Sequence, residues 1–215
     1  SNRSTSTLDY WLFPADDLFN YFKNKPLNSF SEDIRHVHLK AGMDIYGICM
    51  GLVGGNLRAI LTEEEGKTIQ YWDLKAREII GTIDITAEET NVPLFGNEAE
   101  GCVIDDENEH IIISREGMRG ILNAYDANTL EFIKVIDSRS GNIGGDPEGV
   151  TVYKTTDKEG FIIVSSQGDS KFNLYNRQFP FDYIRSFTVN DVTDTDSTFI
   201  KEILSQKYQS IARAI

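Results

Sequence analysis

The chain has no long hydrophobic run and no concentration of basic residues. No stretch of its 215 residues approaches the ~18 apolar residues of a membrane-spanning helix, and its polar N-terminus lacks the hydrophobic region of a signal peptide. A mature secreted protein would lack that region too. Lys and Arg number 21 against 34 Asp and Glu, so the formal net charge is −13. Because phosphate backbones and anionic lipids are held by Lys and Arg clusters, we expect neither nucleic acid nor membrane as a partner.

Cysteine is also scarce, with only Cys49 and Cys102 in the chain. We expect both to be unpaired thiols in buried strands, because free Cys behaves as a small core hydrophobe. A disulfide between them is the alternative, and two cysteines do not identify a redox compartment. The remaining composition is that of a globular protein, since 40% of the residues are hydrophobic and 11% are aromatic.

A sequence pattern that occurs three times organises the chain. Each copy opens with a Tyr or Glu followed by Gly, at Tyr46-Gly47, Glu100-Gly101 and Glu148-Gly149. A second glycine follows in each copy, and then an aromatic residue before Asp or Asn, at Trp72-Asp73, Tyr125-Asp126 and Tyr175-Asn176. The copies are about 50 residues apart, close to the roughly 40 to 50 residues of a propeller blade. Each copy is therefore interpreted as one supersecondary unit.

Each copy contains four short segments rich in Ile, Val, Tyr and Phe, separated by polar and glycine clusters that predict turns. The predicted strands are 48–52, 57–62, 68–72 and 79–85 in the first copy, 101–104, 110–114, 121–125 and 132–136 in the second, and 150–153, 161–165, 172–175 and 183–189 in the third. Recurrence in groups of four favours a β-propeller with blades at about 44–90, 98–140 and 146–190. An irregular β-sandwich is the alternative.

The two ends do not complete whole blades. Residues 1–41, with strand-like segments at 8–13 and 34–39, predict half of a preceding blade, and residues 191–198 predict the start of a further one. A helical stripe predicts a C-terminal helix at 199–215, capped by Asp196 or Ser197. We therefore expect a single all-β domain, an incomplete propeller of about four of six blades. Its open edges predict either that the remaining propeller segments belong to a larger protein or that the helix covers one edge.

Polar residues recur at equivalent places of the predicted blades. The first strand of every blade lines the central channel, so equivalent positions on these strands converge. One ring of such positions consists of Tyr46, Glu100, Glu148 and Asp196, and a second consists of Glu65, Glu116 and Gln167. Converging carboxylates repel one another unless cations neutralise them, and Ca²⁺ suits such oxygen ligands. Solvated turns, in which acid-Gly pairs are common, are the alternative.

Three segments give these residues a family context. Residues 98–107, 146–153 and 160–168, the last ending in Ser165-Ser166-Gln167-Gly168, resemble in order and spacing the motifs of the β-propeller phytases. These enzymes are calcium-dependent phosphatases that cleave phosphate from inositol hexakisphosphate. The resemblance extends over about residues 1–197 and includes the expected Tyr175 and Arg177.

The resemblance implies a role for each matching residue. The implied calcium ligands are Glu100, Glu116, Asp146, Glu148, Gln167, Asp194 and Asp196. Arg3 and Tyr46 would contact substrate phosphate, and Glu100, Glu116 and Tyr46 would form the catalytic set. The implied reaction is hydrolysis of phytate, or of a related phosphate ester, by direct attack of a metal-activated water, with several Ca²⁺ ions as cofactors. A phosphorylated small molecule such as an inositol phosphate is the implied partner, and a secreted or periplasmic location is implied as well.

Two departures from the family motifs favour a different function. Glu64 stands where the family has a phosphate-binding Lys, and Ser197 replaces a motif glycine. An anion in place of that Lys opposes a polyanionic substrate. The alternative is therefore a catalytically impaired phytase-like propeller that acts as a ligand-binding or protein-interaction module.

Three further motifs have competing interpretations. His36 and His38 lie on one face of a predicted strand and could bind zinc, whereas a solvated strand edge is the simpler interpretation. The acidic run 105–108 predicts a polar hairpin or a peripheral calcium site. The segment 51–55 lacks the Lys-Ser/Thr of a phosphate loop and predicts a hairpin turn.

Overall fold

The computed structural model describes residues 5–12, 35–86, 98–116 and 120–188. Apart from a 3₁₀ turn at Thr5, regular structure in these ranges is β. The strands are β1 (Thr7–Leu12), β2 (Arg35–Lys40), β3 (Ile45–Val53), β4 (Asn56–Glu63), β5 (Thr68–Asp73), β6 (Glu78–Asp84), β7 (Ala99–Asp105), β8 (His110–Arg115), β9 (Gly120–Asp126), β10 (Phe132–Ser138), β11 (Asp146–Lys154), β12 (Gly160–Gln167), β13 (Lys171–Asn176) and β14 (Tyr183–Thr188). Within the described residues, no helix is long and apolar enough to cross a membrane.

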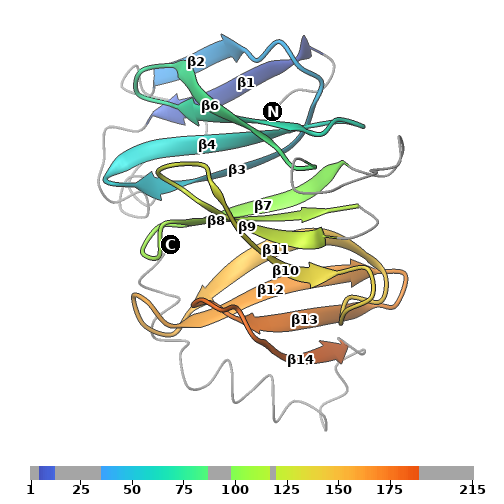
Figure 1. Ribbon diagram of the computed structural model, residues 1–215. Coiled ribbons are helices and arrows are strands. Elements are labelled where there is room, and N and C mark those ends of the chain that lie inside the picture. The colour runs from blue at the N-terminus through green and yellow to red at the C-terminus, as the bar shows by residue number, and fades with distance from the viewer. Residues whose placement is uncertain (1–4, 13–34, 87–97, 117–119, 189–215) are drawn as a thin grey trace, which may run out of the picture. The chain divides into compact units, whose positions relative to one another are not determined.

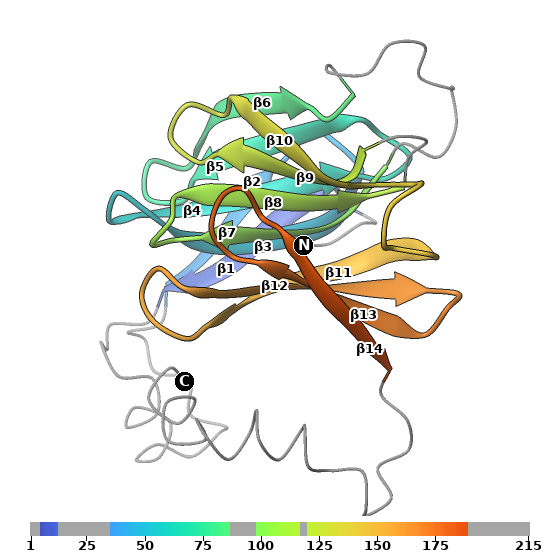
Figure 2. The same ribbon diagram turned by 60° about the horizontal axis from the view of Figure 1, so that its bottom comes forward.

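Twelve of these strands form three four-stranded sheets in chain order, β3 to β6, β7 to β10 and β11 to β14. Neighbouring strands in each sheet are antiparallel. The first strands of the sheets lie against one another, β3 against β7 and β7 against β11 (Figures 1 and 2). This arrangement of consecutive sheets confirms the predicted all-β propeller, and we call the sheets blades one, two and three.

Chain contacts divide the protein into two compact units. Residues 1–8 and 40–188 form the unit that holds the three blades, and residues 9–39 and 189–215 form the other. Strands β1 and β2 pair as a two-stranded sheet, close to the strand-like segments predicted at 8–13 and 34–39. The expected blade start at 191–198 and the helix at 199–215 lie outside the described residues, and the assignment of the whole chain to one partial propeller stays a prediction.

The hydrophobic core lies between neighbouring blades. One cluster joins residues of blades one and two, including Ile60 and Ile69 with Ile111 and Ile113, all of which are fully buried. A second cluster joins blades two and three, including Ile112, Leu122 and Val164. Because β side chains alternate between the two faces of a sheet, both faces of blade two are apolar and each packs against a neighbour. Burial of this apolar surface holds the blades together.

The repeated aromatic-Asp/Asn pair closes the turn between the third and fourth strands. In blade one, Asp73 Oδ1 accepts hydrogen bonds from the N–H groups of Lys75 and Ala76, at 2.9 and 2.8 Å. In blade two, Asp126 Oδ1 accepts hydrogen bonds from the N–H groups of Asn128 and Thr129. In blade three, Asn176 accepts one from the N–H of Gln178. Asp and Asn are suited to this role because their short side chains reach the backbone two residues on.

The first strand of each blade begins earlier than predicted. Strands β3, β7 and β11 start before the Tyr-Gly or Glu-Gly pair, so these residues lie within strands and not in turns. The register of each strand shifts at this pair, between Ile45 and Ile48, between Ala99 and Gly101, and between Pro147 and Val150. A β-bulge of this kind turns side chains locally, which commonly serves a binding site.

The structure contradicts the expectation of unpaired thiols. Cys49 of β3 and Cys102 of β7 form a disulfide, with their Cα atoms 5.7 Å apart, within the usual range. Sequence reasoning placed both cysteines on inner strands but did not fix which residues of the two strands lie opposite each other. The bond ties blade one to blade two.

Candidate functional site

Tyr46, Glu100 and Glu148 point away from the core, as the buried residue directly before each of them indicates. Ile45, Ala99 and Pro147 are buried, and the next residues, Tyr46, Glu100 and Glu148, are partly exposed. Successive side chains of a strand point to opposite faces, so these positions share one side of their inner strands. The propeller repeat thus places a phenol and two carboxylates at equivalent positions of three neighbouring blades.

Close packing of the inner strands explains the glycines at 47 and 101, which each face a main-chain oxygen of the next blade. A Cβ on Gly101 would meet the main-chain oxygen of Glu148 in the next blade and would lie 2.9 Å from Ser114 Oγ. Ser114 Oγ accepts the N–H of Gly101 at 3.0 Å and donates to the Glu148 carbonyl at 2.6 Å. Blades two and three therefore approach at the level of the acidic residues, and a larger residue at 101 would separate them.

Three carboxylates converge at this level of the inner strands. One side-chain oxygen each from Glu98, Glu100 and Glu116 lies within 4.8 Å of the other two. Glu98 comes directly before β7, Glu100 lies in β7, and Glu116 follows β8, which pairs with β7. The N–H of Glu116 donates to the Glu98 carbonyl at 3.0 Å, which fixes the two chain segments side by side. We call these three residues the acidic cluster.

Glu100 has the most perturbed pKa of the acidic cluster. Burial raises its pKa to about 7 against the opposing effect of a hydrogen bond from Tyr46, and the charges of Glu148, Glu98 and Glu116 raise it further. Its Oε2 atom is buried and has no hydrogen-bond partner among the described residues. A buried carboxylate oxygen without a donor is costly, so a bound cation at this place would stabilise the ionised form.

Negative charges also surround Glu116, the third member of the acidic cluster. Burial raises its pKa, and the negative charges of Asp146, Glu98 and Glu148 act in the same direction, while Arg139 opposes them. Arg139 Nη1 donates to Asp146 Oδ1 at 2.8 Å and to the Gly145 carbonyl at 3.1 Å. Both side chains of this ion pair are partly exposed, so Arg139 supplies a positive charge close to the acidic residues.

The acidic cluster fits a hard divalent cation. Its donors are all carboxylate oxygens, which Ca²⁺ prefers, and Glu98, Glu100 and Glu116 are close enough together for a single ion to bridge them. Burial, and after it an excess of negative charge nearby, raises the pKa values of Glu100 and Glu116, and the unpartnered Oε2 of Glu100 lies in the same place. A bound cation would remove that excess.

The structure brings together some of the residues predicted from the sequence. Tyr46, Glu100 and Glu116 lie in or beside the acidic cluster, with Glu148 and Asp146 near enough to affect its pKa values. Gln167 is exposed at the end of β12, opposite Asp146 in the strand ladder. Glu65, from the predicted second ring, is exposed and donates its N–H to Glu98 Oε2 at 2.7 Å. Arg3, Asp194 and Asp196 lie outside the described residues.

Sequence reasoning missed two members of this region. Glu98 lies two residues before Glu100 and therefore on the same side of the strand, a signal that alternation could have supplied. Arg139 belongs to the connection between β10 and β11 and has no counterpart in the repeat pattern. Only the fold places it near the site.

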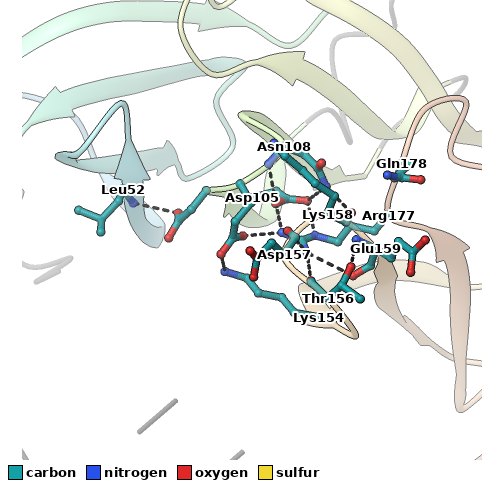
Figure 3. Close-up of polar contacts among 12 residues, drawn as sticks. Leu52, Asp105, Asn108, Lys154, Thr156, Asp157, Lys158, Glu159, Arg177 and Gln178 are labelled. Carbon is teal, nitrogen blue, oxygen red and sulfur yellow. Dashed lines mark hydrogen bonds and ion pairs between the residues drawn. The ribbon is translucent and has the colours of Figure 1, made fainter. Parts of the chain in front are cut away.

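The run 105–108 forms the predicted polar hairpin, and its acidic side chains contact two other blades. Arg177 is fully buried and forms ion pairs with Asp105 and Glu107, while its Nη1 donates to the carbonyls of Thr156, Asp157 and Glu159 (Figure 3). On the opposite side, the N–H of Leu52 donates to Asp106 at 2.9 Å. The hairpin of blade two thereby links blade one to blade three through polar contacts.

Comparisons with known proteins show what the chain is similar to in sequence. A family model described as phytase matches residues 2–203. The chain is 28% identical over 148 residues to a 3-phytase of Bacillus subtilis (strain 168), an alignment that covers 67% of this chain and 37% of that protein. The chain therefore spans little more than a third of that relative's length.

Solved structures with similar folds are distant in sequence. The chain is 8% identical to Saccharomyces cerevisiae Sqt1, with a TM-score of 0.53 over 73% of this chain and 43% of that one. It is 10% identical to Chaetomium thermophilum Raptor, with a TM-score of 0.50 over 74% of this chain and 13% of that one. At such low identities these similarities concern the fold alone.

Proposed function

The chain belongs to the phytase family, and on this basis we propose that it releases phosphate from inositol hexakisphosphate, or from related phosphate esters, in a calcium-dependent reaction. The observation that carries this proposal is the convergence of Glu98, Glu100 and Glu116 beside the Tyr46 hydroxyl. A polyanionic substrate needs positive charge in its site, and an acidic cluster gains that charge only by binding cations.

Glu98, Glu100 and Glu116 would hold the calcium, whose positive charge would offset that of phosphate oxygens and lower the pKa of an attacking water. Tyr46 keeps Glu100 oriented by donating its hydroxyl proton to that carboxylate, and this single proton can go to a phosphate oxygen instead when a cation holds Glu100. Glu116, whose pKa is raised by burial and by neighbouring negative charges, is suited to accept a proton from the attacking water. Arg139 adds a guanidinium that can pair with a substrate phosphate.

The reaction needs no nucleophilic side chain from the chain itself. Ser165 Oγ accepts the N–H of Gly149 at 2.9 Å, and Ser166 Oγ accepts the N–H of Gly145 at 3.0 Å. These hydroxyls hold the backbone of β11 and the connection before it. Direct attack by water is therefore the mechanism that we propose.

The second candidate function is a phytase-like module that binds a ligand or a protein but has lost catalysis. Glu64 favours it, because this exposed carboxylate lies in the connection between β4 and β5 where the family has a phosphate-binding Lys. The negative charge opposes a polyphosphate by roughly 1 kcal/mol at close range in a partly exposed site.

We also propose a secreted or periplasmic location for the protein. The disulfide between Cys49 and Cys102 supports it, because such bonds persist in oxidising compartments and are rare in the cytosol.

Phosphate release and calcium-dependent melting, measured on the same samples, test the proposed function. The samples are the wild-type chain, Glu100→Gln, and Glu78→Gln as a control, because Glu78 is an exposed glutamate at the start of β6. Each is incubated with inositol hexakisphosphate, once with calcium and once with a chelator. We expect release only with calcium, in the wild type and the control, and a loss of about 100-fold or more in Glu100→Gln.

The outcomes separate the two candidate functions. A chain whose melting temperature rises with calcium but which releases no phosphate is the binding module. Equal release with calcium and with chelator contradicts the calcium-dependent mechanism. A chain with neither calcium-dependent melting nor phosphate release contradicts both the enzyme and the calcium site.

A further inference from the structure

Three side chains of the two-stranded sheet form a cluster that is separate in sequence from the acidic cluster. His36 Nε2 and His38 Nδ1 each lie 2.8 Å from the same atom, Asp9 Oδ1. Asp9 belongs to β1, and the two histidines are alternate residues of the neighbouring β2 (Figure 1). All three belong to the unit that includes residues 9–39. Alternation along β2 explains why both rings reach one carboxylate.

The donors of this group differ in kind from those of the acidic cluster. Two imidazole nitrogens and one carboxylate oxygen are ligands that suit Zn²⁺, Ni²⁺ or Cu²⁺, whereas the all-carboxylate set of Glu98, Glu100 and Glu116 suits Ca²⁺. The chain contains only one other histidine, His110, which is half-buried in blade two. Imidazole ligands are therefore concentrated at this one place.

The surroundings leave this group open to a metal ion while limiting its motion. The side chains of His36 and His38 are 49% and 55% exposed, and that of Asp9 is 23% exposed. Trp11, the next residue of β1 on the side of Asp9, stacks on His36 with ring centroids 5.0 Å apart and planes inclined by 17°. The stacked indole restricts the His36 ring, so less conformational entropy is lost when that ring binds a ligand.

We propose that Asp9, His36 and His38 bind a divalent first-row transition metal ion such as Zn²⁺, with water in the remaining coordination positions. In the metal-free protein, each ring nitrogen that faces Asp9 donates its proton to the carboxylate oxygen. In the bound protein, each neutral ring carries its proton on the other nitrogen, and the facing nitrogens and the Asp9 oxygen hold the metal. Both nitrogens lie within hydrogen-bond distance of one oxygen, so a metal ion would replace these two hydrogen bonds, and the exposed rings would turn to bring their nitrogens to it.

Calorimetric titration of Zn²⁺ into the full chain, carrying no histidine tag, tests this proposal. Excess Ca²⁺ is present throughout to occupy the all-oxygen sites. The variants are His38→Asn and Asp9→Asn, and Asp182→Asn is the matched control, because Asp182 is an exposed aspartate of blade three. Loss of an outer-shell partner of a metal site costs about 10- to 100-fold in affinity, so loss of a direct ligand should weaken Zn²⁺ binding by at least as much.

A second readout identifies the ligand atoms. With one equivalent of Cu²⁺, the electron paramagnetic resonance spectrum of the wild-type chain should show coupling to two imidazole nitrogens. The spectrum of His38→Asn should retain one of them. Equal Zn²⁺ affinities in the wild type, His38→Asn and Asp9→Asn overturn the proposal, as does a Cu²⁺ spectrum without nitrogen coupling. Melting curves of the metal-free variants that match the wild type establish that each variant is folded.

Discussion

Replacing Cys49 and Cys102 by alanine should lower the free energy of unfolding by about 4 kcal/mol. The disulfide joins β3 to β7 across the boundary between blades one and two. Cys49 comes three residues after Tyr46 and Cys102 two residues after Glu100, so the bond holds together the strands that carry both site residues. Both cysteines also pack against the core between these blades.

The magnitude follows from the length of chain that the disulfide closes. The two cysteines are 53 residues apart. In the chain-entropy model, a loop of this length removes about 14 cal/mol/K from the unfolded chain, which is about 4 kcal/mol at 25 °C. Because domains are typically stable by only about 5 to 15 kcal/mol, this is a large share of the total.

Equilibrium unfolding in urea, with and without a phosphine reductant, measures the effect. We expect the double alanine variant to unfold at a lower urea concentration than the oxidised wild type, and reductant to lower the wild-type midpoint while leaving the variant unchanged. Thiol titration establishes that the wild type starts fully oxidised. Coincident unfolding curves for the oxidised wild type and the variant would refute the reasoning.

Three further predictions concern packing and charge. Arg177→Leu leaves Asp105 buried without its counter-charge and should cost about 3 to 5 kcal/mol in urea unfolding; a loss below about 1 kcal/mol contradicts this. Gly101→Ala places a Cβ against the Glu148 carbonyl of the next blade and should lower the free energy of unfolding by about 1 to 3 kcal/mol. Gly149→Ala should cost less, because the nearest atom to its Cβ would be 3.5 Å away, and equal losses in the two variants contradict the close approach. Because the folded-state pKa of Glu100 is raised from 4.5 to about 7, its stabilising contribution is present below pH 4.5 and is lost as pH rises to about 7. Without calcium, Glu100→Gln should therefore melt above the wild type at pH 7.5, and calcium should remove the difference; a metal-free variant that melts no higher contradicts the pKa.

The strands of the blades could be predicted because the signals for each strand lie in its own sequence and in the turns beside it. Runs of Ile and Val bounded by Asp, Asn and Gly clusters predict the strands. Asp73 and Asp126 predict turns because their short side chains accept hydrogen bonds from the backbone two residues on. The hairpin turn predicted at 51–55 lies at Gly54-Gly55, because β3 continues to Val53, and both glycines have positive φ, 55° and 76°.

Features that depend on how two blades meet were harder to predict. The disulfide requires Cys49 and Cys102 to lie opposite each other on strands of different blades, and the repeat alone does not set that alignment. The early start of β3, β7 and β11 depends on register shifts at the Tyr-Gly and Glu-Gly pairs, and in β3 and β7 the glycine of the pair faces the backbone of the next blade. Convergence of Glu100 with Glu116 was expected, whereas Arg139 enters the site from a connection outside the repeat.

Calcium binding to the acidic cluster is the central claim, and calorimetric titration of calcium tests it most directly. The wild-type chain, Glu100→Gln and the exposed control Glu78→Gln are titrated under identical conditions at pH 7.5. The wild type and the control should bind calcium with the same affinity, and Glu100→Gln should bind about tenfold more weakly or worse, because it loses both the charge and the unpartnered oxygen. Equal calcium affinity in all three chains would contradict the account.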